Sequence, residues 1–329
     1  MAVRQRAPIE TRPLQRVELP IPEPGQGELL IRVEVCAICR TDLHVIEGDL
    51  PVHRAPLIPG HQVVGRVAAL GPGPQHFKSG DRVGVAWLHA ACGACSPCRR
   101  GEENLCDAPR FTGYDVDGGY AEYLVAPEAF VYPLPAAIPS RQAAPLLCAG
   151  IIGYRALRRS GLRKGERLGL YGFGASAHVV IQIARHWGCE VYVATRGARH
   201  RGLASDLGAI WVGNATDRPP QKLNAAILFA PVGELVPVAL EALDKGGTLA
   251  LAGIYMTDVP PLQYERHLFH ERTIRSVTAN TREDGRELLD LAATIPITTH
   301  TELFPLDQAN AVLQSLKKSE IKAAAVLKL

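Results

Sequence analysis

Hydrophobic and polar positions divide the chain into two stretches of different texture. Up to about residue 149, short apolar runs such as Glu28–Val35, Gln62–Leu70 and Arg82–Ala86 are separated by segments rich in Pro and Gly. Apolar runs bounded by turn residues are typical of β-strands, and helical spacing is sparse here. The pattern predicts a compact, β-rich, partly barrel-like domain.

From residue 150, strand-like runs alternate with segments of helical spacing. The predicted strands are Arg167–Tyr171, Glu190–Ala194, Ala225–Phe229, Thr248–Ala252 and Ile274–Val277. The predicted helices are Ala177–Trp187, Leu203–Leu207, Leu235–Leu243 and Arg282–Ala293. This alternation is the signature of an α/β fold with a doubly wound parallel sheet.

The tail has a β-like pattern again. Leu303–Leu306 and Ile321–Leu327 are strand-like, and we expect them to return to the first domain. The sequence therefore predicts one domain from residues 1–149 and 284–329, and a second from residues 150–283.

Composition excludes several classes of partner. The formal net charge of +3 among 329 residues does not indicate binding to nucleic acid or to anionic membranes. No apolar run reaches the about 18 residues of a membrane span, and the first twenty residues lack the apolar core of a signal peptide. We therefore expect a cytoplasmic protein, in which clustered cysteines indicate metal binding rather than disulfides.

Four cysteines lie close together between residues 92 and 106. Their spacing is C-x2-C-x2-C-x7-C, formed by Cys92, Cys95, Cys98 and Cys106. Four thiolates can enclose Zn²⁺ in a closed tetrahedron, so this zinc would be structural. An iron–sulfur cluster is an alternative, although its usual spacing differs. A nucleic-acid-binding zinc ribbon would need a basic, aromatic face, and the neighbouring Arg and Glu residues balance each other.

A second set of possible zinc ligands is dispersed: Cys39 in CAICRTDLH, His61 in IPGHQVVG and Cys148 in APLLCAGIIGYRAL. Two thiolates, one imidazole and an open fourth position make a catalytic zinc set. Each residue alone has an ordinary explanation as a core cysteine or a loop histidine. Cys36 and Cys39 also match a CxxC redox pair, but the βαβ context of that motif is missing.

A glycine-rich loop follows the predicted strand Arg167–Tyr171. Gly172, Gly174 and Ala177 fit the pattern G-x-G-x-x-G/A between a strand and a helix, where the backbone can approach a dinucleotide pyrophosphate. At the end of the next strand, Thr195 occupies the usual position of the acidic residue that binds the ribose hydroxyls of NAD. Arg196 and Arg199 follow it.

Without that carboxylate, Arg196 and Arg199 could accept a 2′-phosphate, so the sequence favours NADP(H) over NAD(H). The alternative is that both arginines are solvated loop residues.

Taken in order, these motifs resemble the zinc-containing alcohol dehydrogenases of the medium-chain dehydrogenase/reductase superfamily. The resemblance covers the CRTDLH stretch, the PGH turn, the four-cysteine segment, GGYAEY (118–123), the cysteine before GYRAL and the glycine loop. The subgroup is closest to bacterial alcohol and cinnamyl-alcohol-type dehydrogenases. The resemblance implies a GroES-like catalytic domain, a Rossmann domain and a homodimer or homotetramer.

The resemblance also implies roles for individual residues. Cys39, His61 and Cys148 would hold the catalytic zinc, and Asp42 would orient His61. Thr41 would bond to the reacting oxygen, and His44 would pass the proton onward. Trp87 would line the substrate pocket. The expected reaction is reversible hydride transfer between an alcohol and NAD(P), with zinc polarising the oxygen.

The chain departs from the family pattern at three places. Gln62 follows His61 where relatives often have a glutamate, Thr195 replaces the acidic residue, and IKAAAVL (321–327) lacks an arginine used on the pyrophosphate, for which Lys322 could compensate. The alternative functions are a physiological aldehyde reductase or polyol dehydrogenase and, more remotely, a non-enzymatic zinc-binding module.

Overall fold

The computed structural model describes residues 1–321 and 324–329. The chain divides into two compact units. The first consists of Met1–Cys148, Ala279–Thr294 and Thr298–Leu329, and the second of Ala149–Thr278 and Ile295–Ile297. Among the described residues, no helix combines the length and apolarity that crossing a membrane requires.

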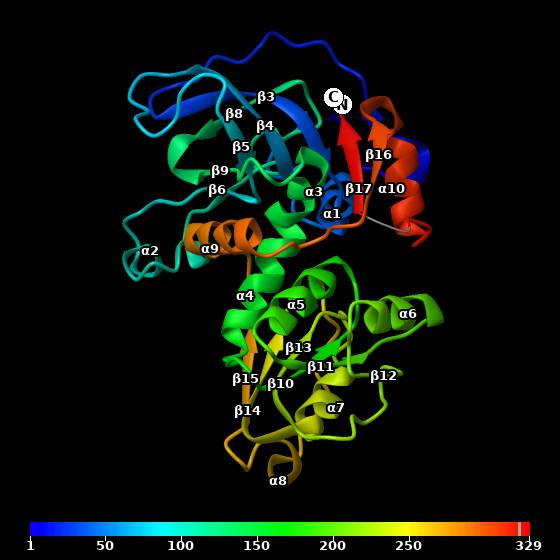
Figure 1. Ribbon diagram of the computed structural model, residues 1–329. Helices are drawn as coiled ribbons and strands as arrows, with labels where there is room; N and C mark the ends of the chain where they lie inside the picture. The colour runs from blue at the N-terminus through cyan, green and yellow to red at the C-terminus, as the bar shows by residue number, and fades with distance from the viewer. Residues whose placement is uncertain (322–323) are drawn as a thin grey trace. The chain divides into compact units, whose positions relative to one another are not determined.

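The first unit is built on a mostly antiparallel sheet (Figure 1), which has seven strands within the described residues. Its strands in spatial order are β16 Thr301–Pro305, β17 Ala324–Lys328, β3 Glu28–Ala37, β4 Gln62–Leu70, β5 Arg82–Val85 and β9 Val131–Pro133, with β8 Tyr123–Pro127 paired to β3. Two short sheets pair β1 Ala2–Val3 with β2 Leu14–Gln15, and β6 Leu88–Ala90 with β7 Arg110–Phe111. The unit thus has the β-rich, GroES-like character that the sequence predicts.

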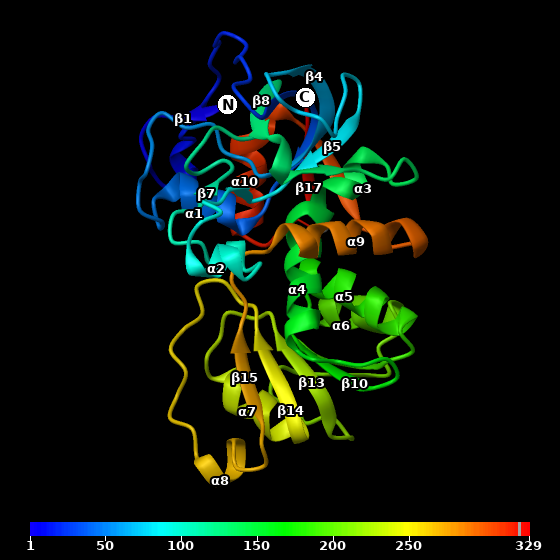
Figure 2. The same cartoon turned by 90° about the vertical axis from the view of Figure 1, so that its left-hand side faces the viewer.

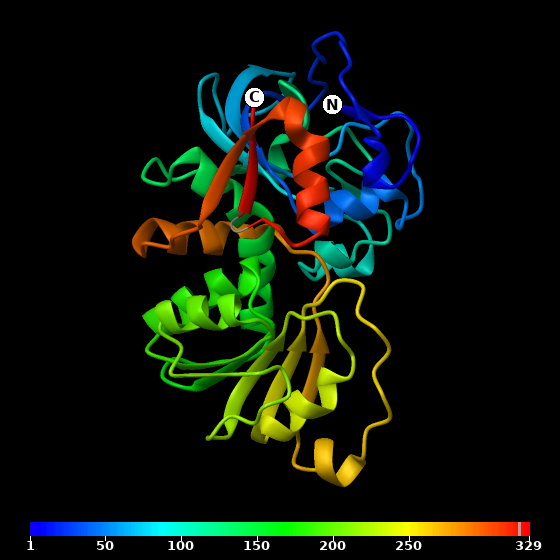
Figure 3. The same cartoon turned by 90° about the vertical axis from the view of Figure 1, so that its right-hand side faces the viewer.

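Short helices surround this sheet. They are α1 Arg40–Glu47, α2 Ser96–Arg99, α3 Ser140–Pro145, α9 Arg282–Thr294 and α10 Ala309–Lys317. Helix α10 is absent from the sequence prediction, which treated the tail as β-like. It packs against α1 (Figure 3). Lys317 forms ion pairs with Glu47 at 2.8 Å and Glu10 at 3.1 Å. This helix therefore connects the C-terminal segment to the helix that begins next to Cys39.

Residues 279–283 belong to the first unit, whereas the sequence prediction placed them in the second domain. The reason is the contacts of the α9 N-terminus. The Asn280 side chain donates to the Tyr132 hydroxyl at 3.5 Å, and Arg282 donates through its backbone N–H and its Nε to Glu103, each at 3.0 Å. These partners are far away in sequence, so no local pattern could indicate them.

The second unit contains a parallel sheet flanked by helices (Figure 2). Its strands in spatial order are β12 Trp211–Gly213, β11 Glu190–Ala194, β10 Arg167–Tyr171, β13 Leu223–Leu228, β14 Leu243–Leu251 and β15 Thr273–Ser276. Its helices are α4 Ile151–Arg159, α5 Ala175–His186, α6 Ala198–Asp206, α7 Leu235–Ala242 and α8 Tyr264–His267. This strand order is that of a doubly wound Rossmann sheet, as the sequence predicts.

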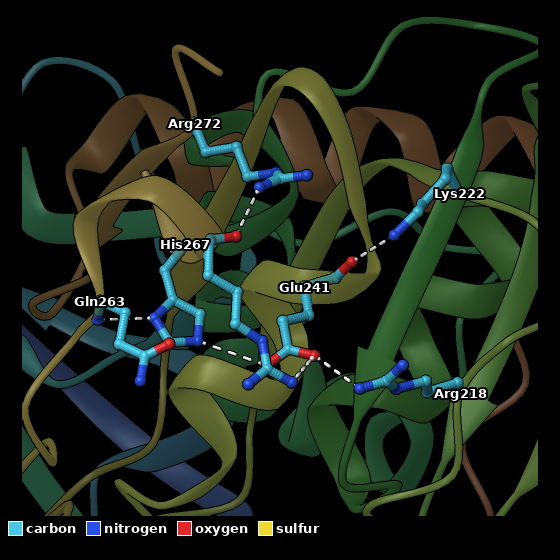
Figure 4. A network of polar contacts seen from close by, with 7 residues as sticks. Arg218, Lys222, Glu241, Gln263, His267 and Arg272 are labelled. Carbon is cyan, nitrogen blue, oxygen red and sulfur yellow. Dashed lines mark hydrogen bonds and ion pairs between the residues drawn. The ribbon is translucent and has the colours of Figure 1, made fainter. Parts of the chain in front are cut away.

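Glu241 of α7 organises the polar contacts around α8 in this unit (Figure 4). Its carboxylate pairs with Arg218 at 2.8 Å, Arg266 at 2.7 Å and His267 at 3.3 Å. Lys222 donates to the backbone carbonyl of Glu241 at 2.6 Å. The network fastens α8 and the segment before β13 to α7.

The register between β3 and β4 positions the candidate site in the first unit. Ala37 at the end of β3 lies opposite Gln62 at the start of β4, so Cys39 and His61 leave the sheet side by side. A third segment, Gly118–Tyr120, is hydrogen-bonded to residues 58–60, with the Gly118 N–H donating to the Ile58 oxygen at 2.7 Å. A Cβ on Gly118 would collide with the Gly60 carbonyl oxygen.

We expect Gly118→Ala to destabilise the protein by about 1–3 kcal/mol, as overpacking of a dense interior does. The measurement is the thermal unfolding midpoint. Gly202→Ala in α6 is the matched control, because a Cβ there meets no atom within 4 Å and Ala is favoured by about 0.5–1 kcal/mol inside a helix. Equal midpoints for Gly118→Ala and the wild-type protein would contradict the packing argument.

Candidate active site

Cys39 is the N-cap of α1, and its sulfur takes the place of the usual hydroxyl cap. The backbone N–H of Thr41 donates to Cys39 Sγ at 3.3 Å, and Asp42 Oδ2 accepts the backbone N–H of Cys39 at 2.8 Å. This is a reciprocal capping box. Because a helix N-terminus favours negative charge, the cap also suits a thiolate.

His61 lies against this cap and is buried. Its Nδ1 is 3.2 Å from Asp42 Oδ1, and its Nε2 is 3.3 Å from Cys39 Sγ. The side chains of His61 and Asp42 are each only 2% exposed. If Nδ1 carries the proton shared with Asp42, Nε2 is the ring atom available to a metal.

Cys148 completes the group from a π-helical turn, Leu146–Gly150. Such turns are rare and frequent at functional sites. The ligand atoms of Cys39, His61 and Cys148 all lie within 4.8 Å of one another. The structure thus brings together three residues that are far apart in the sequence.

The electrostatics of this group fit a bound cation. The Cys148 side chain and His61 lower the pKa of the Cys39 thiol well below its usual value, although burial opposes them. Burial alone would lower the pKa of His61, but the Cys39 thiolate and the Asp42 carboxylate outweigh it and raise that pKa to about 10. These buried anionic groups need a positive charge beside them.

The distances also fit zinc. Two ligands on a tetrahedral zinc, with bonds of about 2.3 Å to sulfur and 2.0 Å to nitrogen, would lie about 3.5 Å apart, close to the 3.3 Å between Cys39 Sγ and His61 Nε2. Three protein donors leave one tetrahedral position for a substrate or water. The donor set can therefore hold a catalytic zinc.

Three further predicted residues lie around this group. Thr41 is in the first turn of α1, where it contacts the Cys39 sulfur through its backbone. His44 is one turn further on, and its Nδ1 is 2.8 Å from Asp49 Oδ2. The ring of Trp87 meets the ring of His61 edge-on at 5.0 Å and stacks on Phe111 at 4.9 Å.

The four clustered cysteines also converge. Their sulfur atoms lie within 4.8 Å of one another, with 4.0 Å between Cys92 and Cys98 and 3.9 Å between Cys95 and Cys106. Four thiolates on a tetrahedral zinc would be about 3.8 Å apart. Backbone N–H groups lower the pKa of Cys92 to about 6, which also suits a thiolate. The set fits a closed structural zinc site.

In the second unit, the glycine loop joins β10 to α5. Gly172 has a φ of 88°, and a Cβ there would meet the Ala230 nitrogen at 2.8 Å. A Cβ on Gly174 would meet nothing within 4 Å, and Ala177 is buried in α5. The open space at Gly174, in front of a helix N-terminus, is suited to a pyrophosphate.

Thr195, Arg196 and Arg199 lie at the end of β11 and the start of α6. Thr195 is buried, and its backbone N–H donates to the Gly213 oxygen at 3.0 Å. Arg196 and Arg199 are exposed. The structure therefore brings the arginines to the expected place after β11. Lys322, the proposed substitute for a pyrophosphate arginine, lies outside the described residues.

Sequence reasoning missed Asp49, the partner of His44. Asp49 lies just beyond the α1 C-cap Gly48 and belongs to none of the recognised motifs. Gln62 stands where family members often have a glutamate. Its side chain is buried, and its Nε2 has no hydrogen-bond partner in the part of the chain that the structure describes. The residue after His61 is thus part of the protein interior.

Comparisons with known proteins agree with this arrangement. Residues 25–136 match the alcohol dehydrogenase GroES-like domain family, and residues 177–294 match the zinc-binding dehydrogenase family. The chain is 56% identical to the probable alcohol dehydrogenase AdhA of Mycobacterium tuberculosis, over 99% of this chain and 95% of that protein.

Solved structures show the same fold. The cinnamyl alcohol dehydrogenase SbCAD4 from Sorghum bicolor has a TM-score of 0.89 at 27% identity, over 99% of this chain and 96% of that one. CAD from Helicobacter pylori, complexed with NADP(H), has a TM-score of 0.85 at 26% identity, over 93% of this chain and 91% of that one. Family, fold and converging cysteines thus agree, and the chain belongs to the zinc-dependent alcohol dehydrogenases of the medium-chain dehydrogenase/reductase superfamily.

Proposed function

We propose that the protein catalyses reversible hydride transfer between a primary or secondary alcohol and its aldehyde or ketone, with NADP(H) as the preferred cofactor. One observation carries the proposal for the active site: the ligand atoms of Cys39, His61 and Cys148 lie within 4.8 Å of one another beside a buried carboxylate. In an alcohol dehydrogenase, such an open three-ligand set is suited to substrate activation.

Two zinc ions per chain are part of the proposal. Cys39, His61 and Cys148 would hold the catalytic ion, and Cys92, Cys95, Cys98 and Cys106 would hold the structural ion. A zinc ion with an open position supplies Lewis acidity, which lowers the pKa of an alcohol and polarises a carbonyl. The closed four-sulfur set supplies folding energy instead.

The surrounding residues would orient the ligands and move a proton. Asp42 holds Nδ1 of His61 and the cap of Cys39, so it fixes two ligands at once. The Thr41 hydroxyl would take up the proton of the substrate hydroxyl, and His44 would pass it onward through the cofactor ribose. Because Asp49 engages Nδ1 of His44, proton exchange would take place at Nε2. Trp87 would form an aromatic wall against which the substrate packs.

For the cofactor, Gly172, Gly174 and Ala177 would let the chain approach the pyrophosphate. Thr195 would take the place of the acidic residue that binds the ribose hydroxyls of NAD, and Arg196 and Arg199 would bind the 2′-phosphate. Related structures include one complexed with NADP(H) and one in complex with NAD, so the preference rests on the missing carboxylate and on the two arginines.

The proposal extends to location and assembly. None of the eight cysteines, all of which lie in the described part of the chain, forms a disulfide, which agrees with a cytoplasmic, reducing environment. We expect a homodimer or homotetramer. Strand β15 ends its sheet, and the nearby Tyr264 and Phe269 are 62% and 51% exposed, so this region could contribute to a subunit contact.

A substrate panel tests the function directly. Initial rates with aliphatic and aromatic alcohols and aldehydes, each with NAD(H) and NADP(H), should show oxidation and reduction. Rates confined to aldehyde reduction, or to polyols, would identify the alternative enzymes of the same fold. Absence of nicotinamide turnover with a zinc-loaded protein would overturn the proposal.

The two metal sites should be separable by mutation. Cys39→Ser should reduce zinc from two ions per chain to one and lower turnover by more than about 100-fold, because even residues that only orient a ligand contribute 10–100-fold. Cys95→Ser should instead lower the unfolding midpoint. Elemental analysis and thermal unfolding are the measurements. A fully loaded wild-type protein with one zinc per chain would contradict the two-site proposal.

Arg196→Ala should weaken NADP⁺ more than NAD⁺, by about 1–3 kcal/mol for a charge-assisted contact. Dissociation constants from fluorescence titration give the difference. Arg201→Ala is the control, since Arg201, on the helix α6 that follows Arg196, is bonded to Asn214 at 2.9 Å and should not discriminate between the cofactors. Equal losses for both cofactors in Arg196→Ala would show that this side chain does not contact the 2′-phosphate.

Gln62→Glu should move the acidic limb of kcat/KM for alcohol oxidation to higher pH. A carboxylate next to His61 adds negative charge, which raises the pKa of groups that must lose a proton. The measurement is the pH profile at constant zinc content. An unchanged profile would mean that Gln62 is directed away from the reacting groups and only fills the interior.

A further inference from the structure

Tyr120 belongs to GGYAEY but has no role in the proposed mechanism. It lies in the segment that is hydrogen-bonded to residues 58–60: the Gly119 N–H donates to the Gly60 oxygen at 2.9 Å, and the Tyr120 N–H donates to the Pro59 oxygen at 3.0 Å. The Tyr120 ring occupies the space where a Cβ on Gly60 would lie. Its position is therefore fixed against the residue that precedes His61.

The hydroxyl group of Tyr120 is in an unusual environment. The whole residue is 0% exposed, and the hydroxyl oxygen has no hydrogen-bond partner among the described residues. Burial and the adjacent Asp42, Cys36 and Cys39 raise the pKa of the phenol well above its usual value, so the hydroxyl keeps its proton. A buried donor without an acceptor is costly, and the groups that act on this hydroxyl, Asp42, Cys36 and Cys39, are the candidate acceptors.

The Asp42 carboxylate has lone pairs left to accept a further hydrogen bond. One of its oxygens faces His61 Nδ1 at 3.2 Å, and the other accepts the Cys39 N–H at 2.8 Å. An ionised carboxylate offers about four lone-pair sites, so these two contacts leave room for a third. Cys36 is a poorer acceptor because its own thiol is buried and protonated.

We propose that Tyr120 is a positioning residue whose hydroxyl donates to Asp42 and thereby holds the carboxylate that orients His61 and Cys39. The inference rests on the proposed metal site. Asp42 would then be fixed from three sides, by His61, by the cap of α1 and by the phenol from the Gly118–Tyr120 segment. Tyr120 would act on the metal only through Asp42 and would touch neither the metal nor the substrate.

The test is Tyr120→Phe, which keeps the ring and removes the hydroxyl. The readout is the affinity of the Cys39–His61–Cys148 site for zinc, measured by competition with a chromophoric chelator. Residues that orient metal ligands contribute about 10–100-fold to affinity, and we expect a loss of about 10-fold. The visible spectrum of the Co²⁺-substituted site should also shift. The four-cysteine zinc should stay bound and serves as an internal control of folding.

Tyr171→Phe is the matched control variant. Tyr171 is 1% exposed, and its hydroxyl also lacks a partner in the described part of the chain, but it lies on β10 in the second unit. Removing this hydroxyl should leave zinc affinity and the cobalt spectrum unchanged. A general effect of deleting a buried hydroxyl would appear in both variants.

A double-mutant cycle with Asp42→Asn separates positioning from packing. If Tyr120 acts through Asp42, the loss caused by Tyr120→Phe should disappear in the Asp42→Asn background. An equal loss in both backgrounds, or no loss in either, overturns the inference.

Should Tyr120→Phe fail to fold, a crystal structure of the zinc-loaded wild-type protein decides. The inference requires about 2.5–3.0 Å between the Tyr120 hydroxyl and an Asp42 oxygen, and a longer separation or an intervening water overturns it. If the wild-type site binds no zinc, the proposed function itself fails. If it binds zinc without the coupling, only the role of Tyr120 fails.

Discussion

The buried Asp42 carboxylate is the contact on which the candidate site depends. One of its oxygens caps the backbone of Cys39, and the other faces Nδ1 of His61. A buried carboxylate beside an ionisable thiol is unfavourable unless positive charge lies next to it. The raised pKa of His61 expresses the same requirement. A divalent cation satisfies it, so the charge balance of the site and its expected chemistry have one cause.

The fold supplies the geometry for this contact with short, local devices. The β3–β4 register sets Cys39 beside His61, and the capping box of α1 fixes the sulfur at a helix N-terminus. The Gly118–Tyr120 segment closes over residues 58–60, and Cys148 arrives on a π-helical turn. None of these devices is strong alone. Together they hold the ligand atoms close, so little reorganisation is needed when a metal binds.

Much of this was predictable from the sequence because the signals are local. Strands β4 and β10 have the predicted bounds, Gln62–Leu70 and Arg167–Tyr171, since their apolar runs end at turn residues. Both cysteine groups follow from residue type and spacing together with the family motifs. By contrast, α10 was not predicted although Val312, Leu313 and Leu316 have helical spacing. The roles of Asp49 and Tyr120 depend on contacts that form only in the folded chain. Residue spacing in the sequence does not predict these contacts.

The central claim is that this chain carries an open three-ligand zinc site and a closed four-sulfur one within the same unit. Anomalous diffraction on either side of the zinc absorption edge tests it most directly. The account predicts two peaks per chain, one bounded by Cys39, His61 and Cys148 and one by the four clustered cysteines. A peak at the four cysteines with none at Cys39, His61 and Cys148, in crystals grown with excess zinc, would contradict it.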